Sequence, residues 1–126
     1  MADRINGVIP DDIALEPLAG EELLSVVLGK HHIELVFEHL RLNIEGGYEV
    51  SEGESVSITA SRENLREGAA VLASLVGRLV AQAEWVPKRG LRLLWGGGSE
   101  FTAVVDESGY ESFSFNVPGS PGMVVV

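Results

Sequence analysis

The chain has 126 residues, of which 45% are hydrophobic, so it is long enough to bury a core as one domain spanning residues 1–126. It contains no cysteine, which excludes disulfides, thiolate metal sites and a cysteine nucleophile. Its 19 acidic and 9 basic residues give a net charge of −10, which disfavours binding to nucleic acid, because phosphate contacts need Lys and Arg.

No stretch approaches the roughly 18 consecutive apolar residues of a membrane helix, and the first residues lack the basic start and apolar run of a signal peptide. These features predict a cytoplasmic protein that does not associate with membranes. The acidic surface would attract a basic protein partner, although acidity can also serve solubility alone.

The first half begins with an irregular lead-in over residues 1–17 and continues with a short apolar strand at 23–28. Residues 33–44 then alternate between apolar and polar side chains, which predicts an antiparallel hairpin around a turn at Glu38 and His39. In this register three apolar pairs share one face: Phe37 with Leu40, Leu35 with Leu42, and Ile33 with Ile44.

A further strand at 55–60 leads to the best helix pattern in the chain. Ser61 is placed to cap a helix over residues 62–76, and Gly77 to end it. The apolar stripe of this helix consists of Leu65, Ala69, Leu72 and Val76, with Leu75 beside them.

The second half has a strand at 79–86 and a hairpin of residues 91–95 and 101–105 around a five-residue loop. Here the expected pairs are Leu91 with Val105, Leu93 with Ala103, and Trp95 with Phe101. Strands at 110–117 and 123–126 complete the chain. The pattern predicts an α+β fold of two antiparallel β-meanders, about eight strands in all, with one central helix at 62–76.

The tripeptide Gly-Tyr-Glu occurs at residues 47–49 and again at 109–111. Chance alone could give a shared tripeptide, but matching strands precede both copies in the same order. The sequence therefore predicts an internal duplication that relates residues 18–50 to residues 75–112. In it Gly47 and Gly109 would turn the chain, and Tyr48 and Tyr110 would begin a strand.

The layout L-x-G, two strands, then G-Y-E, followed by a terminus rich in glycine, proline and valine, covers residues 15–126. It resembles a group of small uncharacterised bacterial proteins, some of which resemble immunity proteins of toxin systems. This resemblance implies binding to a toxin and carries no catalytic residues with it.

Few residues suggest chemistry. His31 and His32 would point to opposite faces of a strand and His39 would lie at its far end, so no metal site is expected. The glycines at 96–98 join two strands and do not precede a helix, which favours a flexible loop over a phosphate site. No cofactor is expected.

Acidic residues follow the second strand of each predicted hairpin, beside each Gly-Tyr-Glu. We expect a surface for a basic partner there, as an alternative to an ordinary solvated loop. Its residues would be Glu45, Tyr48, Glu49, Asp106, Glu107, Tyr110 and Glu111.

The sequence thus favours a non-catalytic acidic binding protein of the immunity or antitoxin type, which masks a basic toxin. A second hypothesis is a homodimer or other homo-oligomeric or small-ligand-binding module that uses Val36 and Leu94 as an apolar face. A hydrolase that depends on carboxylates is the third.

Overall fold

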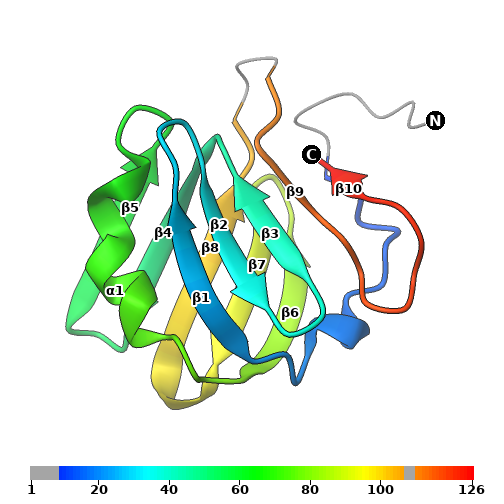
Figure 1. The fold of residues 1–126 in the computed structure, drawn as a ribbon, viewed down its shortest axis with the longest axis horizontal. Helices are drawn as coiled ribbons and strands as arrows, with labels where there is room; N and C mark the ends of the chain where they lie inside the picture. Colours follow the sequence, from blue (N-terminus) through cyan, green and yellow to red (C-terminus); the bar gives the residue numbers. More distant parts are fainter. Residues whose placement is uncertain (1–8, 107–109) are drawn as a thin grey trace.

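The computed structural model describes residues 9–106 and 110–126 and folds them into two five-stranded antiparallel sheets around a shared apolar core (Figure 1). The first sheet has the order β1 (Leu23–Leu28), β2 (Ile33–Phe37), β3 (Arg41–Ile44), β9 (Phe113–Phe115), β10 (Val124–Val125). The second has the order β5 (Val56–Ser61), β4 (Gly47–Glu52), β8 (Ser99–Val104), β7 (Gly90–Trp95), β6 (Val80–Val86). The predicted α+β class is consistent with this largely β fold and its one short helical segment.

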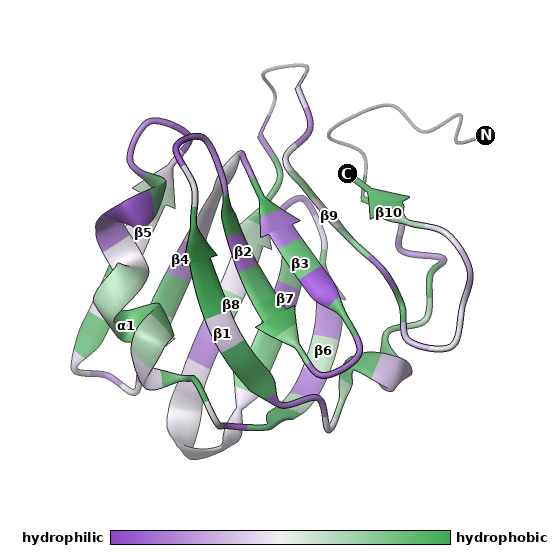
Figure 2. Cartoon of the chain, in the orientation of Figure 1, coloured by the Kyte–Doolittle hydropathy of each residue, from purple (hydrophilic) through white to green (hydrophobic). Residues whose placement is uncertain are grey.

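Alternating side chains explain how the two sheets enclose one core. In β2, β3 and β8, and in β7 from Leu91 onward, every second residue is buried, and hydrophilic and hydrophobic residues alternate along β3 in Figure 2. Phe101, Phe113 and Phe115 are fully buried, and Leu35 and Leu42 lie with them in the same cluster. Burial of such large apolar side chains is the main source of stability in a fold of this size.

Each half of the chain contributes to both sheets. The first half supplies β1–β3 to the first sheet and β4–β5 to the second. The second half supplies β6–β8 to the second sheet and β9–β10 to the first. Exchanging β1–β5 with β6–β10 converts one sheet order into the other. Two three-stranded meanders, β1–β3 and β6–β8, are therefore present. The remaining strands, β4–β5 and β9–β10, each join the sheet of the other half, so the two meanders are not separate units.

The connections that begin the two halves also match. Gly20 N–H donates to the carbonyl of Val80 at 2.7 Å, and Gly77 N–H, 57 residues later, donates to the carbonyl of Leu23 at 2.7 Å. The strand register then shifts after Leu23 in β1 and after Val80 in β6, as a β-bulge would cause. The two halves thus share their entry geometry as well as their strand order.

The first predicted hairpin is confirmed, and the register of the second was wrong. Ile33 pairs with Ile44 and Leu35 with Leu42, as the alternation predicts. In the second hairpin Leu91 pairs with Ala103 instead of Val105. The cause is the loop, because a 3-10 turn η3 (Gly96–Gly98) reverses the chain in three residues and β8 begins two residues earlier than expected.

The predicted helix is shorter than expected. A 3-10 turn η2 (Leu65–Gly68) precedes α1 (Ala69–Ser74), and no side chain caps the start of either. Instead of capping the helix, Ser61 ends β5, and its N–H donates to Asn64 Oδ1 at 2.6 Å. Another 3-10 turn, η1 (Glu16–Leu18), precedes β1. No helix within residues 9–106 and 110–126 is long and apolar enough to cross a membrane.

The two Gly-Tyr-Glu tripeptides do not occupy equivalent places. Tyr48 is fully buried in β4 and pairs with Ala103 of β8, whereas Tyr110 is 70% exposed and lies before β9. Phe113 takes the place of Tyr48 in the second half, since it pairs with Ile44 of β3. Gly47 has the expected positive φ of 145°, and Gly109 lies outside the described residues.

Trp95 is buried, as expected for a core residue at the position that Phe37 occupies in the first hairpin. Its Nε1 has no hydrogen-bond partner among the described residues. Replacing Trp95 with Phe removes a buried unsatisfied donor and leaves a small cavity, and these two effects offset each other. We expect the free energy of unfolding, measured by urea denaturation, to change by less than about 1.5 kcal/mol, whereas Trp95→Ala should cost about 3–5 kcal/mol. A larger loss in the Phe variant would mean that the indole N–H is bonded in solution.

Candidate functional site

Four of the predicted acidic-surface residues meet at one end of the molecule, and we call Glu45, Asp106, Tyr110 and Glu111 the acidic corner. Glu45 lies in the turn between β3 and β4, and the other three lie in the connection from β8 to β9. The main chain of Ser112 joins the segments, because its carbonyl accepts hydrogen bonds from Glu45 N–H at 2.9 Å and Gly46 N–H at 2.8 Å. The exchange of strands between sheets therefore brings acids from both halves together.

Arg62 fixes one side of the acidic corner. Its Nη2 donates to Asp106 Oδ2 at 2.7 Å and to the carbonyl of Glu111 at 3.2 Å. The guanidinium carbon also lies 5.8 Å from the centre of the Tyr110 ring, within the range of a cation–π contact. Asp106 N–H donates to the Ser112 hydroxyl at 3.0 Å. Asp106 is thus partly neutralised, and Tyr110 is positioned by a cation although its ring remains exposed.

The remaining carboxylates, Glu45 and Glu111, repel each other. Partial burial raises the pKa of Glu111, and the negative charge of Glu45 and a hydrogen bond with its carboxylate raise it further, while hydrogen bonds from Ser114 and Asn43 lower it. Asn43 Nδ2 also donates to Glu45 Oε2 at 3.0 Å. Within residues 9–106 and 110–126 neither carboxylate forms an ion pair with Lys, Arg or His. The acidic corner therefore holds negative charge that the described protein does not neutralise.

Three predicted residues do not join the acidic corner. Tyr48 lies in the core, where its hydroxyl donates to the carbonyl of Leu65 at 2.6 Å and accepts from Gly68 N–H at 3.0 Å. Glu49 forms an ion pair with Arg89 on the outer face of the second sheet. Glu107 lies outside the described residues. Tyr48 and Glu49 are neighbours in a strand, so their side chains point to opposite faces.

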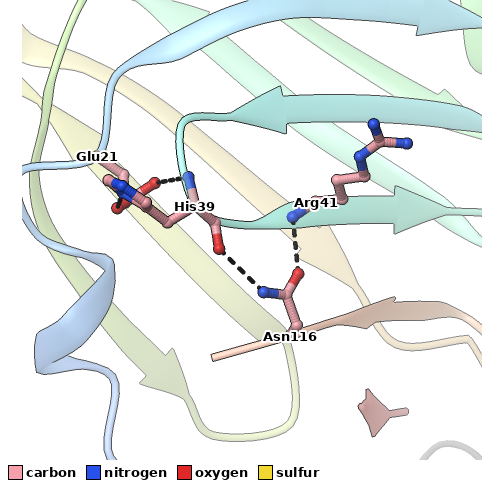
Figure 3. Close-up of polar contacts among 4 residues, drawn as sticks. All are labelled: Glu21, His39, Arg41 and Asn116. Carbon is pink, nitrogen blue, oxygen red and sulfur yellow. Dashed lines mark hydrogen bonds and ion pairs between the residues drawn. The ribbon is translucent and has the colours of Figure 1, made fainter. Parts of the chain in front are cut away.

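A contact that the sequence did not suggest holds the turn between β2 and β3 (Figure 3). The buried carboxylate of Glu21 accepts a hydrogen bond from His39 N–H at 2.7 Å and contacts His39 Nδ1 at 2.8 Å. From the other side, the Asn116 amide donates to the carbonyl of His39 and accepts from Arg41 N–H. The turn is therefore tied to both the start of β1 and the segment after β9.

Arg78 has the corresponding role in the second half of the chain. It lies 57 residues after Glu21, and its guanidinium donates to Ser99 Oγ at 3.1 Å and to the carbonyl of Gly96. Both side chains thus bind the loop of the hairpin in their own half. This shared position indicates that the Glu21–His39 contact is a structural anchor, and His31 and His32 lie at the opposite end of β2 from it.

The Glu21–His39 contact predicts a pH dependence of stability. The hydrogen bond with Glu21, and then its charge, raises the pKa of His39 above its usual range. The stability gained is fully present below the unfolded-state pKa of about 6.5 and is lost as pH rises through the higher folded-state pKa. We therefore expect His39→Gln to be destabilised relative to wild type at pH 5.5 and to approach wild type at pH 9, in urea denaturation. His31→Gln is the control, and an equal difference between His39→Gln and wild type at both pH values would contradict the prediction.

The acidic corner combines two repelling carboxylates with an exposed phenol ring, an arrangement suited to bind a cationic side chain. Among the described residues no group of three or more His, Asp or Glu side chains is placed to hold a metal ion. No protein-family model, curated protein or solved structure matches this chain.

Proposed function

We propose that the protein is a non-catalytic binding protein whose acidic corner masks a basic surface of a protein partner, as an immunity protein masks a toxin. The observation that carries the proposal is the pair Glu45 and Glu111, held close together without a cationic partner among the described residues. An Arg or Lys from a partner would relieve their repulsion and gain charge-assisted hydrogen bonds.

Tyr110 and the overall charge support the same partner chemistry. Tyr110 is 70% exposed and directly precedes Glu111 in the chain, and exposed aromatic side chains are frequent anchors of protein interfaces. The net charge of −10 would steer a basic protein toward this surface and speed its association. We also propose that the protein is related to immunity proteins, as its sequence layout suggests, and that it is located in the cytoplasm.

The experiment is affinity capture from the native host with three immobilised proteins. They are the wild type, the double variant Glu45→Gln/Glu111→Gln, and the control double variant Glu38→Gln/Glu54→Gln, which removes the same charge at exposed turns elsewhere. A basic protein identified by mass spectrometry is expected with the wild type and the control, and at least tenfold less of it with the first variant.

The affinity of the captured partner should also fall steeply between 50 and 300 mM salt, because exposed charges are screened over a shorter distance. At a pH near the raised pKa of Glu111, the buffer should take up protons on binding, because a cation beside this carboxyl lowers its pKa. Equal capture by all three proteins, or an affinity that salt does not change, would remove the acidic corner from the proposal.

Self-association is the second candidate function. The apolar side chains that β1 exposes suit it better than Val36 and Leu94, the residues expected from the sequence. Val36 and Leu94 are half-buried, whereas Leu24, Val27 and Leu28 of β1 are each 44–46% exposed. Sedimentation of the wild type in 0.5 M salt tests this candidate. A dimer that persists there and is lost in Val27→Lys would support it, and a monomer at all concentrations would reject it.

A further inference from the structure

A cavity lies beside β6, the edge strand of the second sheet. Residues 9–20 pass between β6 and β10 in Figure 1 and are fixed to β6 at two points. Gly20 N–H donates to the carbonyl of Val80 at 2.7 Å, and Trp85 Nε1 donates to the carbonyl of Ile13 at 2.9 Å. Between these points the two segments separate and leave about 460 Å³. We call this cavity the β6 slot, and it is lined by residues 13–16, Ala19 and residues 81–85.

At the edge of β6 that faces the slot, backbone N–H and C=O groups have no backbone hydrogen-bond partner among the described residues. Residues 82–85 pair with β7 on one side, and Ala81 lies at the bulge of β6. Within residues 9–106 and 110–126 residues 81–85 form no other backbone hydrogen bond. An antiparallel edge strand turns alternate N–H and C=O groups away from its neighbour, so this edge is a template for another strand. All five residues are at least partly accessible.

The dimensions and side chains of the slot suit one extended chain. Five strand residues span about 16 Å at about 3.3 Å each, which matches a peptide of similar length. Ala81 and Ala83 project little, so they leave room for small apolar side chains, and residues 13–19 opposite β6 block the approach of a whole second sheet. At the equivalent edge of the first sheet the chain places its own helix α1 against β1.

The charge of the slot selects among peptides. Glu16 and Glu84 contribute carboxylates to the lining, and none of the lining residues is Lys or Arg. Arg92 approaches Glu84 at 3.5 Å, but Glu16 forms no ion pair with another described residue. The lining therefore favours basic over acidic side chains at the ends of a bound peptide.

We propose that the β6 slot binds an extended peptide segment with small apolar residues flanked by Lys or Arg, which adds to the second sheet as a strand beside β6. This mode of recognition uses backbone hydrogen bonds for affinity and side-chain size and charge for specificity. The site shares no residue with the acidic corner and does not depend on the proposed function.

The test is a titration of the full chain with acetyl-Lys-Val-Ala-Val-Lys-amide. Trp85 reports on the slot by its fluorescence, and the Trp95→Phe background makes it the only tryptophan. We expect saturable binding with a Kd below about 1 mM. The same peptide with its alternate amides N-methylated should bind at least tenfold more weakly, because it cannot donate to the edge of β6. A peptide with Glu in place of Lys should also bind more weakly.

Two Ala→Leu variants separate the slot from general apolar binding. Ala81→Leu places a larger side chain in the slot and should weaken binding at least tenfold, whereas Ala73→Leu at an exposed position of α1 should leave the affinity unchanged. No saturable change up to 1 mM peptide, equal binding of the N-methylated peptide, or unchanged binding by Ala81→Leu would each overturn the proposal.

Discussion

The Gly90→Ala variant is expected to lose about 2–6 kcal/mol of its free energy of unfolding, because among the described glycines the Cβ added at Gly90 would make the closest contact. Gly90 begins β7 with a φ of 150°, a region that residues with a side chain rarely adopt. A Cβ atom added there would lie 1.9 Å from the carbonyl oxygen of Ala103 in β8. Because this oxygen belongs to the backbone, the clash can be relieved only by moving β7 away from β8.

Urea denaturation with an unchanged m-value measures the loss. The control is Gly53→Ala, where φ is also positive at 61° but no atom lies within 4 Å of the added Cβ. Only backbone strain of about 1–2 kcal/mol is expected there. If the two variants lose the same stability, the close approach of β7 and β8 at Gly90 is not present in solution.

Tyr48→Phe is expected to cost about 2–4 kcal/mol, although it removes a single oxygen atom. The Tyr48 hydroxyl bridges two backbone groups of η2, the Leu65 carbonyl and the Gly68 N–H, and burial of this hydroxyl raises the pKa of Tyr48. The phenylalanine ring would keep the stacked contact with Phe101, whose centre lies 5.4 Å away. The loss therefore comes from two buried polar groups left without a partner.

Thermal and urea denaturation of Tyr48→Phe should be compared with those of Tyr110→Phe. The same oxygen is removed at a residue that is 70% exposed, and a change below about 0.5 kcal/mol is expected. Amide hydrogen exchange at Gly68 should also accelerate in Tyr48→Phe. Wild-type protection of this amide in the variant would show that another acceptor replaces the hydroxyl.

The sequence was sufficient for the first hairpin because its alternation and its short turn together allow only one pairing. Its turn has two residues, and a shift of one residue would expose Leu35 and Leu42. The second hairpin is different, since a shift of two residues keeps the same side chains inward. The turn of three consecutive glycines decides between the two registers. In this turn Gly97 and Gly98 have positive φ, and glycine has no side chain from which the turn geometry could be predicted.

The acidic corner was partly predictable for a related reason. Acids after the second strand of each hairpin were visible in the sequence, but their meeting depends on β9 pairing with β3 across the two halves. The tripeptide misled the prediction at Tyr48 and Glu49, because the two copies are not structurally equivalent. The anchor of Glu21 and His39, and the cavity beside β6, join segments at least 18 residues apart and leave no local pattern.

Titration of the Glu111 carboxyl by carbon-13 NMR, in the wild type and in Glu45→Gln, tests directly whether the acids of both halves share one corner. If strand exchange brings acids of both halves into one corner, the pKa of Glu111 lies above its ordinary value in the wild type. It should fall in Glu45→Gln, because the neighbouring negative charge is gone. A Glu111 pKa that is ordinary in the wild type, or that Glu45→Gln does not change, would show that the two carboxylates do not share a site.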